Sequence, residues 1–125
     1  MTEIAYFSVT GQTRRFVQKA GVTDLYEIKR FTPEFPEMTS PFILIVPTYV
    51  QPITQPVNDF LEAHENFKYC AGIFGGGNRN FDPDFCFTAK NLSQEFELPL
   101  LHLFEFQGND EDVQKLREEV ARFEN

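Results

Sequence analysis

Short apolar runs alternate with longer amphipathic segments along the whole chain. Four of these runs are almost continuously apolar, at residues 4–7, 42–46, 69–74 and 100–106, and a weaker one lies at residues 25–28. Unbroken apolar runs of this length are typical of strands that are covered on both faces. The pattern therefore predicts five buried strands.

The segments between these runs repeat their apolar residues at helical spacing. They predict four helices, marked by Phe16, Val17 and Ala20; by Val57, Phe60, Leu61 and His64; by Phe85, Ala89, Leu92 and Phe96; and by Val113, Leu116, Val120 and Phe123.

The last predicted helix has the clearest start. Asn109 is expected as its N-cap, and residues 110–112 are acidic, as the positive end of a helix favours. We expect Glu111 to pair with Lys115 and Glu118 with Arg122, and the acidic residues of this helix to form a solvated face.

Strictly alternating strands and helices predict a doubly wound α/β fold. We expect a five-stranded parallel sheet in the order 2-1-3-4-5 with helices on both faces. Residues 29–41 contain three prolines and are expected to form an extended loop or a single helical turn. The chain shows no internal repeat and no linker, so residues 1–125 are predicted to form one domain.

The charge of the chain narrows the possible ligands. Nineteen acidic residues against eleven basic ones give a net charge of −8, the wrong sign for binding a nucleic-acid backbone or an anionic membrane. The longest uncharged stretch, residues 38–58, is broken by prolines and does not predict a membrane span. The first apolar run follows Glu3 and is too short for a signal peptide, so we expect a cytoplasmic protein.

Cysteine and histidine are too sparse for a metal site or a disulfide scaffold. Cys70 and Cys86 are expected to be free, buried thiols, and together with His64 and His102 they lack the spacing of a zinc site. Neither cysteine starts a phosphatase loop, because the sixth residues after them are Gly76 and Leu92. We expect no metal in this chain.

Residues 8–13, directly after the first predicted strand, have the composition of a phosphate-binding loop. They supply three hydroxyl groups, a glycine and the free N–H groups of the helix that follows. The loop contains no lysine, which suits a tightly held monophosphate better than a reacting triphosphate. A Ser/Thr-rich turn with a helix cap is the alternative interpretation.

Other nucleotide sites do not match. Gly72 and Gly77 have the spacing of a triphosphate loop, but Asn78 takes the place of its lysine. A dinucleotide fingerprint beginning at Gly75 would need a third glycine where Asn80 stands. The third predicted strand is followed by Pro47 rather than by the carboxylate of a phospho-acceptor domain.

Two further loops are expected at the same edge of the sheet, because the carboxyl ends of parallel strands meet there. Thr48 and Tyr49 follow the third strand, and residues 75–81 follow the fourth. A flat ring system could stack on Tyr49 and Phe81, with backbone amides of the glycine loop at its polar rim. Ordinary rim aromatics are the alternative in a chain with fifteen phenylalanines.

These motifs carry a resemblance to a known family. The segment SVTGQT at residues 8–13 resembles the phosphate loop of flavodoxins. Together with PTY at 47–49, GGGNRNF at 75–81 and LPLLHLFEFQGNDEDV at 98–113, it resembles the NrdI family over essentially the whole chain. Members of that family are small flavodoxin-like proteins that bind FMN and assist class Ib ribonucleotide reductase.

The resemblance implies a site and a reaction. Reduced FMN would convert dioxygen to superoxide and deliver it to the radical-generating small subunit, whose cofactor site it would oxidise; electrons would come from a donor protein or reductase. Any metal would belong to the partner, and no residue here is assigned as a catalytic acid or base. The implied FMN-binding residues are Ser8, Val9, Thr10, Gly11, Gln12, Thr13, Thr48, Tyr49, Val50, Gly76, Gly77, Asn78, Asn80 and Phe81.

Two positions depart from the family pattern. Val50 stands in a loop that is usually glycine-rich, where flavodoxins turn over a peptide on reduction. A β-branched residue resists positive φ by about 1–2 kcal/mol, so we expect a weakly stabilised one-electron-reduced flavin. Asp82 replaces a usual glycine, and we interpret it as the start of the next helix, with Pro83 at the first helical position.

Two alternative functions stay open at this point. A general electron-carrying flavodoxin would need the phosphate loop but not the GNRNF motif, and a flavin-free interaction module would need neither. His102 and Glu105 resemble an acid–base pair, but we expect a satisfied core histidine and a carboxylate at the end of a strand.

Overall fold

The computed structural model describes residues 2–30, 34–78 and 85–123. Its five parallel strands lie in the order β2-β1-β3-β4-β5, which confirms the predicted doubly wound, flavodoxin-like sheet. The strands are β1 (Glu3–Phe7), β2 (Leu25–Ile28), β3 (Phe42–Val46), β4 (Cys70–Gly77) and β5 (Leu100–Glu105).

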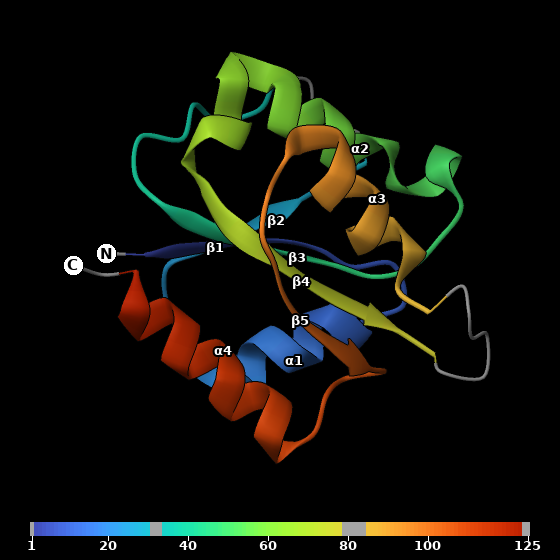
Figure 1. The fold of residues 1–125 in the computed structure, drawn as a ribbon, viewed down its shortest axis with the longest axis vertical. Helices are drawn as coiled ribbons and strands as arrows, with labels where there is room; N and C mark the ends of the chain where they lie inside the picture. The colour runs from blue at the N-terminus through green and yellow to red at the C-terminus, as the bar shows by residue number, and fades with distance from the viewer. Residues whose placement is uncertain (1, 31–33, 79–84, 124–125) are drawn as a thin grey trace.

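Helices cover both faces of the sheet (Figure 1). They are α1 (Gln12–Ala20), α2 (Gln51–Glu62), the 3-10 segment η1 (Ala63–Tyr69), α3 (Phe87–Phe96) and α4 (Asp110–Arg122). Helices α1 and α4 lie on one face, and α2 and α3 lie on the other. No helix within the described ranges is both long and apolar enough to cross a membrane.

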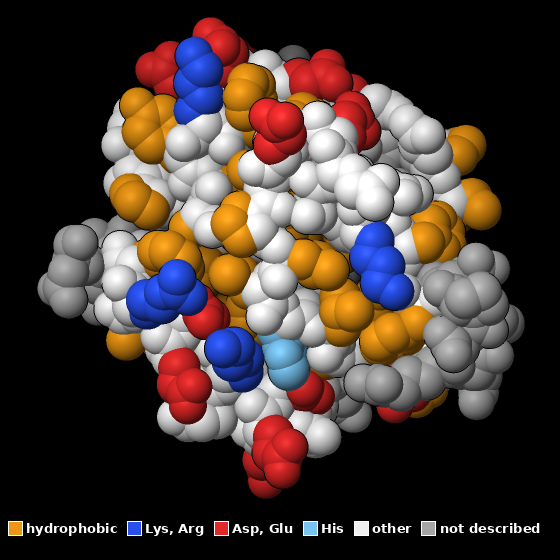
Figure 2. Space-filling view, in the orientation of Figure 1, with side chains coloured by type: hydrophobic (Ala, Val, Ile, Leu, Met, Phe, Trp, Pro, Cys, Tyr) orange, Lys and Arg blue, Asp and Glu red, His pale blue; other side chains and the backbone are white. Residues whose placement is uncertain are grey.

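The core forms two layers because alternate residues of a strand point to opposite faces. On β1, Ile4 and Tyr6 pack with α1 and α4, whereas Ala5 and Phe7 pack with α2 and α3. β3 is buried at every position, which explains its unbroken apolar run. The edge of the sheet formed by β5 is less covered, and Leu100 of this strand is 38% exposed. Figure 2 shows hydrophobic side chains gathered across the middle of this side of the molecule.

The loop between β2 and β3 has no regular structure over residues 34–41, as expected; residues 31–33 lie outside the described part. It is held by the fully buried Asn66, whose Oδ1 accepts from the Met38 N–H at 2.8 Å. The amide nitrogen of Asn66 donates to the carbonyls of Pro36 and Phe60 at 2.9 and 3.0 Å. One buried amide therefore replaces the hydrogen bonds that a helix would supply.

Four element boundaries differ from the sequence predictions. Helix α2 ends at Glu62, before His64, which has a positive φ of 53°. Helix α3 begins at Phe87, so its first residue is not Pro83; Asp82 and Pro83 lie outside the described residues. β5 ends at Glu105, because Phe106 has a φ of 52°. β4 starts at Cys70 rather than at residue 69 and continues through the glycines to Gly77.

These strand positions need glycine because neighbouring elements approach them closely. A Cβ atom on Gly75 would lie 2.5 Å from Ala89 Cβ, and one on Gly76 would lie 2.9 Å from the Phe104 ring. Side chains at these positions would push α3 and β5 away from β4.

Helix α4 begins as predicted but pairs differently. Asn109 Oδ1 accepts from the Asp112 N–H, and Asp112 Oδ2 accepts from the Asn109 N–H, each at 2.9 Å. The predicted ion pairs of Lys115 with Glu111 and of Arg122 with Glu118 are wrong. Both cations instead bind Glu119, each at 3.1 Å. Glu119 is only 4% exposed and is an exception to the expected solvated face, because two cations compensate its burial.

Candidate functional site

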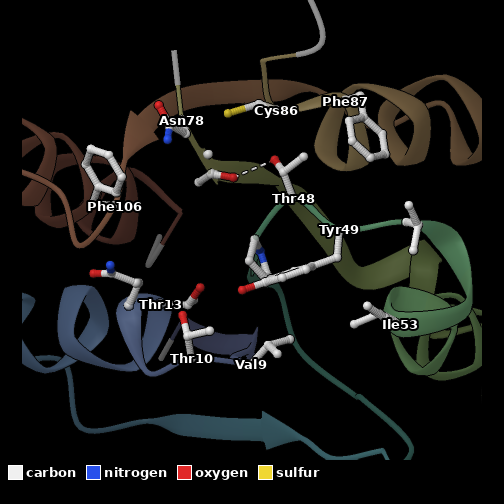
Figure 3. A pocket seen from close by; sticks show the side chains of 15 residues that line it. Val9, Thr10, Thr13, Thr48, Tyr49, Ile53, Asn78, Cys86, Phe87 and Phe106 are labelled. Atoms are coloured by element: carbon white, nitrogen blue, oxygen red, sulfur yellow. Dashed lines mark hydrogen bonds between the residues drawn. The ribbon is translucent and has the colours of Figure 1, made fainter. Parts of the chain in front are cut away.

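A cavity of about 560 Å³ opens at the carboxyl ends of β1, β3, β4 and β5 (Figure 3). Four separate loop regions contribute to it, as expected for the switch point of this strand order. Its lining residues are Val9, Thr10, Gln12, Thr13, Pro47, Thr48, Tyr49, Val50, Ile53, Gly76, Gly77, Asn78, Cys86, Phe87 and Phe106.

The loop after β1 curves tightly into helix α1. Gly11 caps the helix with a φ of 94°, which is a conformation that favours glycine. Ser8 Oγ accepts from the N–H groups of Gly11 and Arg14 at 3.2 and 3.4 Å and so shapes the loop. The N–H groups of Gln12 and Thr13 belong to the first helical turn and have no acceptor within the helix. The loop therefore presents donors to a bound anion.

Two neighbouring arginines take different positions beside this loop. The Arg14 guanidinium binds the Glu27 carboxylate, with Nη2 to Oε2 at 2.6 Å and Nε to Oε1 at 3.3 Å. Arg15 instead folds back over Gly11, with its guanidinium atoms 3.8 Å from the position that a Cβ on Gly11 would take. Sequence reasoning noted the lack of lysine and missed Arg15, which lies one helical turn beyond Gly11.

The Arg14–Glu27 pair joins α1 to β2 together with Tyr6. The Tyr6 hydroxyl donates to Glu27 Oε1 at 3.0 Å. Hydrogen bonding from Arg14 is the main reason that the pKa of Glu27 is lowered. Burial, followed by the contact with Glu27, raises the pKa of Tyr6. This cluster braces the base of the loop and leaves the Arg14 charge committed to Glu27.

The loop after β3 forms an apolar wall of the cavity. Thr48 Oγ1 donates to the Gly76 carbonyl at 2.7 Å and ties this loop to β4. Tyr49 follows, and Figure 3 shows its side chain extending into the cavity. The backbone of Val50 is extended, with a φ of −60° and a ψ of 151°, and the residue is 60% exposed. The wall is therefore an exposed apolar surface on an anchored backbone.

Phe106 forms the wall on the other side, and sequence reasoning missed it. Its N–H donates to the Gly77 carbonyl at 3.1 Å, and the residue is 51% exposed. A positive φ is uncommon for a bulky aromatic residue and marks a constrained turn. The Gln107–Gly108 pair after it could have signalled that turn. Pro47, Ile53, Cys86 and Phe87 are further lining residues that were not predicted as site residues.

The cavity brings together most of the residues predicted from the sequence. Ser8 and Gly11 shape the first loop from behind, and Asn80 and Phe81 lie outside the described residues. A role in binding stays a prediction for every site residue named from the sequence. The predicted residues that line the cavity are Val9, Thr10, Gln12, Thr13, Thr48, Tyr49, Val50, Gly76, Gly77 and Asn78.

His102 does not pair with Glu105. Its Nε2 lies 2.7 Å from Asp112 Oδ1, in the capping box of α4, and its ring centroid is 5.6 Å from that of Phe74. The histidine is satisfied, as expected, but half-buried rather than in the core. Neither Cys70 nor Cys86 forms a disulfide within the described part of the chain, and both are buried; burial raises the pKa of Cys70 to about 12.

The donor set fits a flavin cofactor. The loop after β1 supplies hydroxyl and amide donors, and Tyr49, Val50, Phe87 and Phe106 offer apolar surface for a ring. None of the described lining residues is Asp, Glu, His, Lys or Arg. These residues are suited to binding and orienting a group that carries its own chemistry.

The fold and the cavity place the protein in the flavodoxin-like class. A short-chain flavodoxin associated with a bacterial microcompartment matches 98% of this chain and 96% of its own at 13% identity and a TM-score of 0.70. Oxidised Flavodoxin 2 from Bacillus cereus matches the same shares at 19% identity and a TM-score of 0.65. At these identities the likeness shows the fold.

Sequence comparison identifies the family. The family model described as "NrdI Flavodoxin like" matches residues 4–118. Protein NrdI of Chromohalobacter salexigens is 38% identical, with 94% of this chain and 92% of the relative covered. Protein NrdI of Bartonella bacilliformis is 33% identical, with 96% of this chain and 95% of the relative covered. The chain belongs to the NrdI flavodoxin-like family, which implies a flavin cofactor and an association with ribonucleotide reductase.

Proposed function

We propose that this protein binds FMN in the cavity at the carboxyl edge of the sheet. The observation that carries the proposal is that one cavity joins a hydroxyl- and amide-rich loop to apolar walls. The phosphate would lie against residues 8–13. The ring would lie between the loop after β3 and the end of β4, with Tyr49 and Phe106 on its sides.

The chain's own residues would each do a separable task. The N–H groups of Gln12 and Thr13 and the Thr10 hydroxyl would donate to the phosphate, and Arg15 would add a positive charge beside it. Thr48 would keep the Gly76 carbonyl in place through its 2.7 Å hydrogen bond, so that the wall under the ring does not shift. The apolar side chains would exclude water from part of the ring.

We further propose that the protein activates the radical-generating small subunit of a class Ib-like ribonucleotide reductase in the cytoplasm. When bound and reduced, FMN would supply one-electron reduction of dioxygen to superoxide. Family membership supports this proposal. The described part of the cavity contains no carboxylate, imidazole or amine, which is consistent with chemistry carried by a cofactor. A donor protein or reductase would supply the electrons.

The test is activation of the cognate small subunit. The FMN-loaded protein is reduced, mixed with that subunit carrying Mn(II) or, separately, Fe(II), and exposed to oxygen. Electron paramagnetic resonance then measures the protein radical. We expect a radical that requires the protein, the reductant and oxygen together. Free reduced FMN at the same concentration is the control. If the loaded protein does no better than free FMN with a competent subunit, the activating role is refuted.

A further inference from the structure

Thr88, in the first turn of α3, makes two hydrogen bonds to the backbone of one residue of the cavity wall. Its Oγ1 donates to the Tyr49 carbonyl at 3.0 Å and accepts from the Tyr49 N–H at 3.1 Å. A hydroxyl can donate once and accept twice, so this one group satisfies both backbone polar groups of Tyr49. Thr88 is 5% exposed and is not among the residues that line the cavity.

The next residue is fixed from the other side. The Val50 carbonyl accepts from the N–H groups of Ile53 and Thr54, at 3.0 and 3.4 Å, as helix α2 begins. The backbone at residues 49–50 is therefore held by α3 on one side and by α2 on the other. Tyr49 and Val50 both line the cavity, and Figure 3 shows the Tyr49 ring extending into it.

We infer that Thr88 is a positioning residue that fixes Tyr49 against the flavin ring before the cofactor binds. This inference rests on the proposed function. A wall that is ordered in the free protein spares binding the entropy cost of ordering it. The Tyr49 carbonyl already accepts from Thr88, and the Tyr49 side chain extends into the cavity, so we expect the ring to meet that side chain.

Removing the Thr88 hydroxyl should weaken binding of the flavin ring and leave binding of the phosphate unchanged. In Thr88→Val, which has nearly the same shape, the Tyr49 backbone loses both partners. Affinity should fall by about tenfold for FMN and by the same factor for riboflavin, which lacks the phosphate. Thr88→Ser keeps the hydroxyl and should bind both ligands like the wild type.

Ser93→Ala is the matched control on the same helix. The Ser93 hydroxyl also donates to a backbone carbonyl, that of Leu98 at 2.5 Å, but it does not line the cavity. We expect lower stability without a change in flavin affinity. The inference is overturned if Thr88→Val binds both ligands normally, if it loses affinity for FMN alone, or if Ser93→Ala weakens binding equally. If the wild type binds neither ligand, the proposed function fails instead.

A second measurement needs no variant and applies even if Thr88→Val does not fold. The Tyr49 amide proton is bonded to Thr88 in the free protein, so its hydrogen exchange should be slow without ligand and within about tenfold of the rate with FMN bound. Exchange at the rate of an unstructured peptide in the free, folded protein would show that the wall is not held in advance and would overturn the inference.

Discussion

Gly75→Ala is the substitution that most directly links the packing of the sheet to the site. Gly75 lies in β4 under helix α3, and an added Cβ would be 2.5 Å from Ala89 Cβ and 3.1 Å from Leu103 Cδ2. Cβ atoms essentially never approach below 3.0 Å and ordinary contact begins at 3.4 Å, so the first pair must separate by 3.0 − 2.5 = 0.5 Å at the least and by 3.4 − 2.5 = 0.9 Å for ordinary contact. Ala89 Cβ cannot rotate away, because it is fixed to the helix backbone. Helix α3 therefore has to move.

This displacement should reduce both stability and cofactor binding. Overpacking of this kind costs roughly 1–3 kcal/mol of unfolding free energy. Helix α3 also carries Thr88 and Phe87, so a shift of 0.5–0.9 Å moves one wall of the cavity and the hydrogen bonds to Tyr49. We expect FMN affinity to fall by roughly tenfold or more.

Gly72→Ala separates these two effects. Its Cβ would be 2.5 Å from Leu101 Cγ and 2.6 Å from Leu101 Cδ1, a clash with a partly buried, rotatable side chain away from the cavity. Urea unfolding of the ligand-free proteins and titration with FMN measure stability and affinity separately. We expect Gly72→Ala to lose stability but bind FMN normally. Normal FMN binding by Gly75→Ala, or equal losses of affinity in both variants, would refute this reasoning.

Three further predictions concern single charged or titrating groups. Arg15→Gln should weaken binding of FMN but not of riboflavin in parallel titrations, because the guanidinium lies over Gly11. Glu27→Gln should cost less than about 1 kcal/mol at pH 7, given the partly exposed Arg14 pair. It should also make stability depend less on pH in the acid range. The Glu27 carboxylate contributes to stability above its ordinary pKa of 4.5, and this contribution is lost as pH falls through the lowered pKa of the folded protein. Burial raises the pKa of Cys70 from 9.0 to about 12. The contribution of this thiol to the free energy of unfolding is therefore complete below pH 9.0 and is lost as pH rises toward 12. Cys70→Ala should therefore flatten the alkaline loss seen in urea unfolding by up to roughly 1 kcal/mol per pH unit.

The parallel sheet with helices on both faces could be predicted because burial on both faces leaves a strong mark on the sequence. β3 is apolar at every position and buried at every position. The loop at residues 8–13 could also be predicted, because its hydroxyl groups and its glycine stand between a predicted strand and a predicted helix. Both are local patterns that do not depend on knowing the neighbours.

Features that depend on neighbours were missed. Gly75–77 looked like a loop, and only the approach of Ala89 and Phe104 explains why glycines continue the strand. Phe106 looked like strand, because the positive φ that turns it toward the cavity comes from the following turn. Thr88 is separated from Tyr49 by 39 positions, and no sequence spacing marks that contact.

The central claim is that the cavity binds FMN, and titration of the folded, ligand-free protein with FMN and with riboflavin tests it most directly. Quenching of flavin fluorescence should show one saturable site with a Kd below about 1 μM for FMN, and weaker binding of riboflavin because it makes no contact with loop 8–13. Absence of saturable FMN binding at concentrations of tens of micromolar, in protein shown to be folded, would contradict the account.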